Sequence, residues 1–292
     1  MKARIRKVPL LKERTKSLML LIDMHVHSTF SDGTLSPEQI VSLAKTRGIS
    51  VLALTDHDTT AGLPSFKKAC DEANLASLAG IELSAEAPFV LHILGYRIDH
   101  DAARLKGRLE YVRDGRDARN RIMCEKLQAL GIDVKYEEVI AAAGGEVAAR
   151  PHIARLIMRK GYVNSISEAF SKYIGDGAPA YAERVMLSPE ECISLITDAG
   201  GVAVLAHPQK CRLNFNALEA LVMRLKDAGL WGIEAIYGST PPDLTYNYIK
   251  LAEKFGLYTT AGSDFHGGNR AGTELGVPVS EDLLPWARLG VR

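Results

Sequence analysis

Short apolar runs alternate with helical segments along most of this sequence, and this alternation limits the fold more than any other feature. The apolar runs that we predict as strands are 18–22, 49–54, 78–81, 89–94, 202–206, 231–237 and 257–261. Most are followed by apolar residues at helical spacing, and strands joined by helices usually run parallel. The sequence therefore predicts an α/β protein with a largely parallel sheet that closes into a barrel.

Two of the predicted helices begin with the same capping signal. Ser36 is followed by Pro37 and Gln39, which gives an N-cap hydroxyl, a proline at the first helical position and a capping-box side chain. Ser188-Pro189 repeats the first two of these. The helix after the first strand is predicted to end at Gly48.

Histidine and carboxylate side chains follow or interrupt the predicted strands. His25 and His27 face the same side of an extended chain, and Asp32, next to Gly33, can turn back toward them. In barrels of this class the working residues lie at the carboxyl ends of the strands. Of the eight histidines, only His100 falls outside a cluster or short motif, so a metal site is favoured over scattered surface histidines. The candidate metal ligands are His25, His27, Asp32, His57, Glu82, His92, His207, Asp264 and His266.

The number and type of these candidates predict the metals and the reaction. One tetrahedral or octahedral ion uses about four to six ligands, so this set predicts about two or three ions. Metals about 3.5–4 Å apart suit phosphoryl transfer. A mixed histidine and carboxylate shell fits Mn, Fe or Zn better than Mg or Ca, and we expect Mn first.

Several of these residues have a simpler interpretation. His57 can cap a strand end, His207-Pro208 can form a turn, and His92 can be a histidine of the core. Asp56 and Asp58 can close a turn, and we expect them to support His57 rather than to bind an ion.

Carboxylates on the predicted strands are further candidates. Glu82 would be buried at a strand end, where a metal would supply the partner that a buried carboxylate needs. Glu234 and Tyr237 lie on the strand 231–237 and are candidates for lining the pocket.

Residues 99–184 interrupt the alternation, because strand signals are nearly absent there. We predict a helical insert over these residues, packed on a barrel made of 22–98 and 185–292, with 1–21 as an N-terminal extension. Arg150-Pro151-His152 begins a predicted helix, where free N–H groups suit an anion. Arg150 can bind a phosphate through its guanidinium fork, or it can be an exposed arginine on a loop.

The composition argues against several classes of protein. The formal net charge of +1 predicts no long nucleic-acid footprint. The cysteines, at 70, 124, 192 and 211, form no close pair and indicate reduced thiols in a cytoplasmic protein. No apolar run reaches membrane-spanning length, and Met1 to Ser17 lacks the core of a signal peptide. We interpret that basic segment as a frayed extension, with an early start codon or a targeting arm as alternatives.

These motifs resemble those of the PHP family, the polymerase and histidinol phosphatase superfamily of metal-dependent phosphoesterases. The matching pieces are His25-Val26-His27 with Asp32, Thr55-Asp56-His57-Asp58, Gly80-Ile81-Glu82, His92, Ala206-His207-Pro208 and Gly262-Ser263-Asp264-Phe265-His266. The resemblance implies a distorted (β/α)7 barrel with a trinuclear metal cluster held by the nine candidates. It also implies that catalysis depends on His25, His27, Asp32, His57, His207, Asp264 and His266.

Within this family the chain is similar to a subgroup with a helical insert between the strands of His92 and His207. Its members are 3′,5′-nucleotide bisphosphate phosphatases, and some are 5′-to-3′ exoribonucleases on short RNA. The subgroup's Arg-Pro-His matches Arg150 and His152, which implies that they bind substrate phosphate. We therefore expect a 3′,5′-nucleotide bisphosphate or a short oligonucleotide as substrate.

Two alternatives stay open at this point. One is a phosphatase of another small phosphomonoester, such as histidinol phosphate. The other is a non-catalytic, metal-stabilised module, which a loss of ligands would mark, and no ligand of the motif is lost here.

Overall fold

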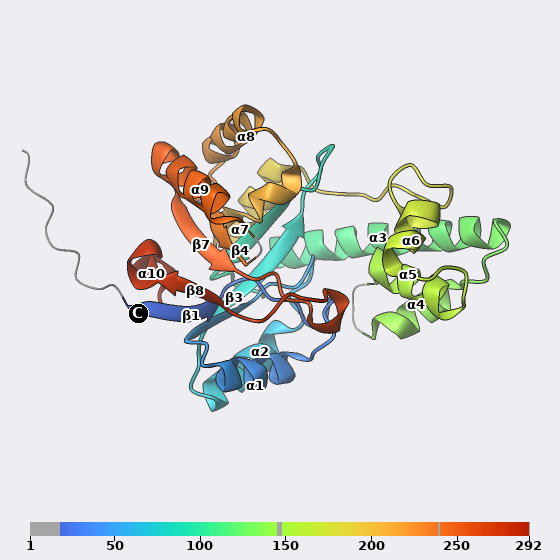
Figure 1. Cartoon of the computed structure of the whole chain (residues 1–292), viewed down its shortest axis with the longest axis horizontal. Helices are drawn as coiled ribbons and strands as arrows, with labels where there is room; N and C mark the ends of the chain where they lie inside the picture. Colours follow the sequence, from blue (N-terminus) through green and yellow to red (C-terminus); the bar gives the residue numbers. More distant parts are fainter. Residues whose placement is uncertain (1–17, 145–147, 239, 292) are drawn as a thin grey trace, which may run out of the picture.

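The computed structural model of the chain describes residues 18–144, 148–238 and 240–291. Eight strands form one sheet in the order β7-β6-β5-β4-β3-β2-β1-β8, and the sheet curls into a nearly closed barrel (Figure 1). The strands are β1 (Met19–Asp23), β2 (Val51–Leu54), β3 (Ala76–Ser84), β4 (His92–Tyr96), β5 (Val202–Leu205), β6 (Gly232–Tyr237), β7 (Tyr258–Gly262) and β8 (Val277–Ser280). The predicted α/β barrel is confirmed.

Helices cover the outside of this barrel. Helices α1 and α2 lie together on one side, and α8 and α9 lie together on the opposite side (Figure 1). The barrel helices are α1 (Pro37–Arg47), α2 (Leu63–Glu72), α7 (Pro189–Asp198), α8 (Phe215–Asp227), α9 (Pro242–Phe255) and α10 (Trp286–Leu289). Short 3-10 helices are η2 (Pro208–Cys211), η3 (Gly267–Asn269) and η4 (Glu281–Leu283).

The N-terminal extension predicted over 1–21 falls largely on residues 1–17, which lie outside the described residues. Residues Met19 to Leu21 are part of strand β1 and pair with β8. The described part of the barrel therefore begins before residue 22.

The sheet is more mixed than the sequence predicted. Strand β3 pairs with β4, β4 with β5, and β1 with β8 in antiparallel directions, whereas the other neighbours are parallel. The segment 85–91 between β3 and β4 is too short for a helical crossover, so these strands form a hairpin. Strand β8 was not predicted, because it is short and carries Pro278, as edge strands do.

The barrel closes between the first and seventh strands. Met24 N donates to Ala261 O at 3.1 Å, and His27 N donates to Phe265 O at 2.9 Å. The segment that carries the first histidines therefore lies beside the segment that carries Asp264, although the two are far apart in sequence.

The predicted helix starts are confirmed. The Ser36 side chain accepts the Gln39 N–H, and the Gln39 side chain accepts the Ser36 N–H at 2.9 Å, which completes the capping box. Gly48 ends α1 with a φ of 72°, and the Ser188 side chain accepts the Glu191 N–H.

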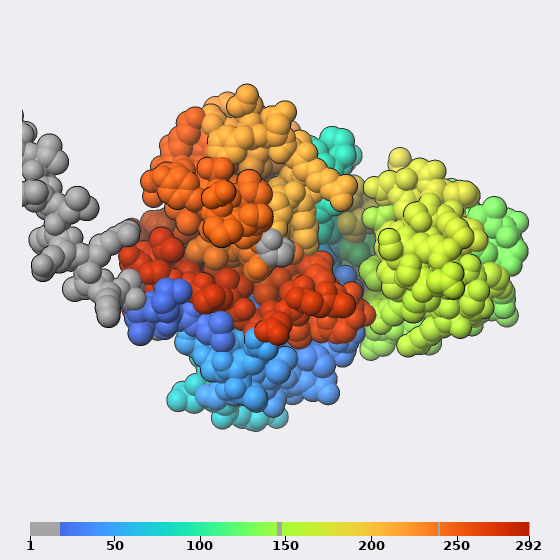
Figure 2. Space-filling model, viewed as in Figure 1, coloured from blue at the N-terminus to red at the C-terminus, as the bar shows by residue number. Residues whose placement is uncertain are grey.

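The insert forms a lobe beside the barrel (Figure 2). Its long helix α3 runs from the barrel to the far end of the lobe, and the shorter helices pack on it (Figure 1). The insert elements are α3 (Ala103–Ala129), α4 (Tyr136–Ala143), α5 (Arg150–Arg159), α6 (Ile166–Ala169) and the π-helix η1 (Phe170–Ile174). Their apolar faces form a hydrophobic cluster that includes Met123, Leu127, Val139 and Ile157. Helix α6 continues directly into the π-helix η1.

Among the described residues, no helix has both the length and the apolar composition that a membrane span needs.

Candidate metal centre

The nine predicted ligands meet at one end of the barrel. His25 and His27 follow β1, Asp32 lies on the next loop, and His57 follows β2. The sequence placed Glu82 after a strand, but β3 is longer than predicted and contains it; His92 is the first residue of β4 rather than an interior one. The remaining three are His207 after β5, and Asp264 and His266 after β7.

Glu82 lies at the centre of this group and is fully buried. Five histidine nitrogens surround its two carboxylate oxygens. Oε2 lies 3.2 Å from His25 Nε2, 3.1 Å from His27 Nε2 and 3.1 Å from His57 Nδ1, and Oε1 lies 2.8 Å from His92 Nδ1 and 2.9 Å from His207 Nε2. A single carboxylate can therefore be shared by several ions at this position.

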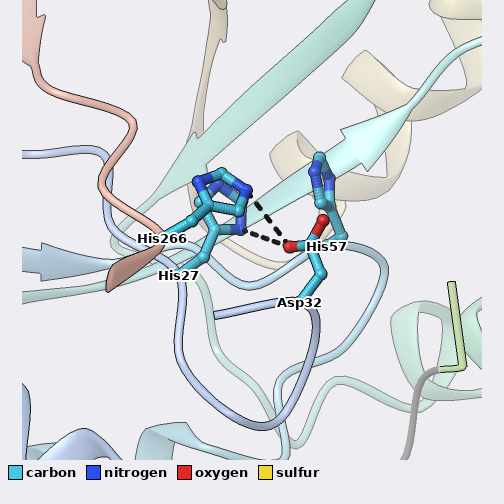
Figure 3. Close-up of side chains that lie close together, drawn as sticks. All are labelled: His27, Asp32, His57 and His266. Atoms are coloured by element: carbon cyan, nitrogen blue, oxygen red, sulfur yellow. Dashed lines mark ion pairs between the residues drawn. The ribbon is translucent and has the colours of Figure 1, made fainter. Parts of the chain in front are cut away.

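Asp32 forms the second group, on the side facing the loop after β1. Figure 3 shows its carboxylate pointing toward His27 and His266, with His57 beside it. Asp32 Oδ1 lies 3.2 Å from His266 Nε2 and 3.8 Å from His27 Nδ1. Gly33 makes this loop possible, because a Cβ there would lie 2.2 Å from the carbonyl oxygen of His27.

Asp264 completes a third group with the first two histidines. Its Oδ1 lies 3.6 Å from His25 Nε2 and 3.4 Å from His27 Nε2. Each set below offers ligand atoms that all lie within 4.8 Å of one another: His27, Asp32, His57 and His266; His25, His27, Glu82 and Asp264; His57, Glu82 and His92. Overlapping sets of this kind suit several ions with shared ligands.

The ligand atoms in this group lack ordinary partners. The following buried atoms have no hydrogen-bond partner: His25 Nε2, His27 Nε2, Asp32 Oδ1, His57 Nδ1, Glu82 Oε2 and His207 Nδ1. Buried polar atoms are normally hydrogen-bonded, and imidazole and carboxylate donors together suit divalent cations. The residues present therefore fit a site for divalent metal ions.

The carboxylates also change how the histidines hold protons. Burial lowers the pKa of His27, but the nearby carboxylates of Asp264 and Glu82 outweigh burial and raise it to about 9. Burial alone dominates at His207, and it lowers the pKa to about 4 despite the hydrogen bond to Glu82. Some imidazoles therefore carry a positive charge when no metal ion is bound.

The backbone is strained where it presents these side chains. Asp58, His207 and Asp264 have φ values of 54°, 27° and 59°, in a region that non-glycine residues seldom adopt. Such strain persists only where the surroundings enforce it, and it concentrates at functional sites. Gly262 lets its strand lie close to His25, because a Cβ at residue 262 would lie 2.4 Å from the His25 Cβ.

A cleft of about 1370 Å³ opens beside the candidate metal ligands, between the barrel and the insert. His92 lines it on the barrel side, and Arg119, Arg150 and Arg184 line it on the insert side. Figure 2 shows the surface hollowed between the two lobes. Ligand pockets commonly have about 300–1,000 Å³, so this cleft is large for a small molecule.

The two predicted phosphate-binding residues differ in their surroundings. Arg150 begins α5, and its Nη1 lies 2.8 Å from Asp176 Oδ1 at the rim of the cleft. His152 is buried, and its Nδ1 accepts the Ala149 N–H at 2.9 Å. Burial, then Arg155, lower the pKa of His152 to about 4, so this imidazole is neutral at pH 7 and offers an Nε2–H donor.

A model of the PHP domain matches residues 23–228 of this chain. The chain belongs to the PHP family. A 3′,5′-nucleoside bisphosphate phosphatase of Chromobacterium violaceum is 35% identical over 92% of this chain and 95% of its own length. A 5′-3′ exoribonuclease of Haemophilus influenzae is 33% identical over 84% of this chain and 89% of its own.

A solved structure shares the fold of this PHP chain. The Bifidobacterium adolescentis protein, described as a metal-dependent phosphoesterase, superposes with a TM-score of 0.79 at 30% identity. The alignment covers 89% of this chain and 92% of that one.

Several charged residues around the PHP site were missed by the sequence analysis. Arg119 on α3 lines the cleft, and Arg116, three residues earlier on the same helix, pairs with Asp58; helical spacing could have placed the two together. Lys210 and Arg270 both form ion pairs with Asp264. No sequence signal places these last two together, because they follow different strands.

Asp58 joins the PHP barrel to its insert. Its Oδ2 is an ion-pair partner of Arg116 from α3 and lies 3.4 Å from Arg184 Nη1. Ser84 donates its N–H to Asp58 Oδ1 at 2.9 Å, which fixes the carboxylate against β3. The residue after the candidate ligand His57 therefore positions the arginines of the insert.

Glu234 orients two of the candidate ligands. It is fully buried beside a register shift in β6, and its Oε1 lies 2.9 Å from His25 Nδ1. Its Oε2 accepts the His207 N–H at 2.7 Å. A carboxylate on Nδ1 fixes the tautomer of a ligating histidine and leaves Nε2 free for the ion. This gives Glu234 a clearer role than the pocket lining that the sequence predicted.

Replacing Glu234 with glutamine is expected to weaken metal binding by about 10- to 100-fold, because His25 would lose its orienting carboxylate. Titration of Mn into metal-free protein, followed by calorimetry, measures the change. Glu253→Gln, at an exposed position of α9, is the matched control. Equal affinity of Glu234→Gln and wild type would contradict the orienting role.

Proposed function

We propose that this chain is a metal-dependent phosphoesterase that converts a 3′,5′-nucleotide bisphosphate into a 5′-mononucleotide and phosphate. The observation that carries this proposal is the cleft that the candidate ligand His92 lines from the barrel and a cationic wall lines from the insert, made of Arg119, Arg150 and Arg184. A substrate with two phosphates places one at each of these features. The relatives named above support the choice of nucleotides.

The nine candidates would hold the ions. Their number suits about two or three, and their mixture of imidazole and carboxylate suits Mn, with Fe or Zn as alternatives. Ions bound here would offset the charge on phosphoryl oxygens and make water a better nucleophile near neutral pH. Glu82, which belongs to two of the three ligand sets, would then help to hold more than one ion.

Arg119 is the centre of the cationic wall. Arg119 is 4% exposed, and its Nε has no hydrogen-bond partner. Burial, then the guanidinium groups of Arg116 and Arg184, lower its pKa, so the positive charge is costly in the ligand-free protein. A phosphate would offset this charge, and its oxygens match a guanidinium fork.

Arg150 would complete the site of the retained phosphate. It lies 2.8 Å from Asp176, whose side chain is 81% exposed, so that ion pair is easily exchanged for a substrate anion. His152 would contribute an Nε2–H donor rather than a charge. Holding the retained phosphate orients the other toward the metal centre.

Cleavage of short RNA from its 5′ end is a second candidate function, and the size of the cleft favours it. At about 1370 Å³ the cleft exceeds common small-molecule pockets, so further nucleotides have room beyond the first. The retained-phosphate position would then hold the 5′-phosphate, and the first internucleotide phosphate would take the place of the cleaved one. We also propose a cytoplasmic location, on the ground of the unpaired cysteines.

A panel of substrates tests the proposed function. Metal-loaded protein is expected to hydrolyse a 3′,5′-bisphosphate at least about 10-fold more efficiently than the matching 3′-monophosphate, because a charge-assisted contact is added. Phosphate release is measured for both, for histidinol phosphate and for a short RNA. Faster turnover of histidinol phosphate would favour the other phosphatase, and no turnover of any substrate would indicate a non-catalytic module.

The pH dependence of metal binding follows from His27. With a pKa of about 9 in the metal-free chain, this imidazole is protonated at pH 7, and an ion must displace the proton. Metal affinity is therefore expected to rise with pH up to about 9. Calorimetry in buffers of different ionisation heat counts the protons released, and a count of zero at pH 7 would contradict this expectation.

A further inference from the structure

Two cations lie on the solvent side of Asp264 and have no role in the function proposed above. Lys210 Nζ and Arg270 Nη1 both form ion pairs with Asp264 Oδ2, and Tyr237 OH donates to the same oxygen at 3.0 Å. The other oxygen, Oδ1, faces the candidate ligands His25 and His27. Asp264 thus separates the metal centre from a pair of positive side chains.

These cations are placed between the metal centre and solvent. Their side chains are 29% and 35% exposed, whereas Asp264 is 2% exposed. Lys210 lies on η2, directly after the candidate ligand His207, and lines the cleft. Arg270 follows η3, after the candidate ligand His266. Both therefore lie at the same end of the barrel as the ligands, on short segments next to them.

The Asp264 carboxylate cannot balance the charges of Lys210 and Arg270 once metal ions bind its Oδ1. Asp264 carries a single negative charge, and the metal ligation proposed above would already use it. Lys210 and Arg270 would then be two partly buried cations that lack an equivalent anion. A phosphoryl group at the metal centre carries about two negative charges and would restore the balance.

Arg270 does not depend on the Asp264 carboxylate for its position. Its Nη1 also donates to the backbone oxygen of Asp264 at 2.9 Å and lies 3.4 Å from Tyr237 OH. The guanidinium group therefore stays in place if its contact with Oδ2 is exchanged for a ligand oxygen.

We propose that Lys210 and Arg270 bind the phosphoryl group that is cleaved, apart from the retained phosphate held by Arg119 and Arg150. This inference rests on the proposed function and adds the residues that contact the reacting group. Every substrate carries the cleaved phosphate, and only some carry the retained one. Lys210 and Arg270 should therefore affect all substrates, whereas Arg119 and Arg150 should affect only those with a second phosphate.

The test uses the full-length metal-loaded protein with inorganic phosphate as the probe. Lys210→Met and Arg270→Gln are each expected to weaken phosphate binding by about 10- to 100-fold in calorimetry, as the loss of a charge-assisted hydrogen bond predicts. Lys210→Arg keeps the charge and should retain most of the binding. Lys68→Met, at an exposed position of α2, is the control and should bind as wild type does.

Two further readouts separate this role from support of Asp264. Metal content by element analysis should equal that of wild type in both variants, and thermal unfolding should show that both are folded. Each variant should lose the same factor in kcat/KM on a 3′,5′-bisphosphate and on a 3′-monophosphate. A fall in metal content at unchanged phosphate affinity would overturn the inference, because the cations would then only position Asp264.

The outcomes also separate this inference from the function itself. Wild type that binds phosphate and hydrolyses nucleotides, with both variants unchanged, would overturn the roles of Lys210 and Arg270 alone. Metal-loaded wild type that neither binds phosphate nor hydrolyses any phosphate ester would overturn the proposed function, and this inference with it.

Discussion

Replacing Asp264 with alanine is expected to lower kcat for phosphate release by on the order of 10³-fold while the barrel stays folded. Several kcal/mol of charge stabilisation at a metal centre are at stake, and each 1.36 kcal/mol corresponds to a factor of ten. The carboxylate is the only acidic member of its group besides Glu82, so the ions there would lose half of their balancing charge. Steady-state kinetics with added Mn measures the change.

A second variant distinguishes the loss of a metal ligand from the loss of the fold. Asp264 has a φ of 59°, which alanine tolerates poorly and asparagine tolerates better. Asp264→Asn should therefore stay folded and still lose most of its activity. Asp243→Ala, at an exposed position in the first turn of α9, is the matched control. Near-normal turnover in Asp264→Asn would mean that Asp264 is not a ligand.

Replacing Arg119 with methionine is expected to lower kcat/KM for the bisphosphate by about 10- to 100-fold and to leave the 3′-monophosphate nearly unchanged. The same replacement should raise the thermal stability of the ligand-free protein, because it removes a buried cation whose neighbours are other cations. Kinetics on both substrates and thermal unfolding without ligand measure the two effects. A purely structural arginine would show the opposite change in stability.

Variants of Arg150, the other arginine proposed to hold the retained phosphate, can be compared with the Arg119 variant. Arg150→Ala is expected to lose efficiency on the bisphosphate only, and Arg150→Lys should also lose, because lysine lacks the guanidinium fork. Arg159→Ala, at the exposed end of the same helix, serves as control. Equal losses on both substrates in the Arg119 and Arg150 variants would contradict a separate site for a second phosphate.

The barrel was predictable from local patterns, and its strand directions were not. The cap at Ser36 and the apolar runs specify where helices and strands form, because they act within a few residues of the chain. Whether β4 runs parallel or antiparallel depends on the segment 85–91 and on contacts with β5, which lie far away in sequence. Strand β8 forms for a similar reason, since it pairs with β1, which lies far away in sequence.

The candidate ligands were predictable for a different reason from the residues around them. Histidine and acidic residues after apolar runs are rare enough to be noticed one by one. Arg119, Lys210 and Arg270 are ordinary charged residues in the sequence, and Glu234 was predicted only to line the pocket. The closed barrel and the packed insert place all four near the site. Their positions depend on contacts such as Glu234 with His25, which are 209 residues apart.

We propose that this site binds several ions together and that the chain hydrolyses a phosphate ester there. The most direct test titrates Mn into metal-free protein and records, in the same samples, bound metal by element analysis and phosphate release from a 3′,5′-nucleotide bisphosphate. We predict that turnover appears only when more than one ion is bound per chain, and that it reaches its maximum at about two or three. Full turnover with a single bound ion, or with none, would contradict the account.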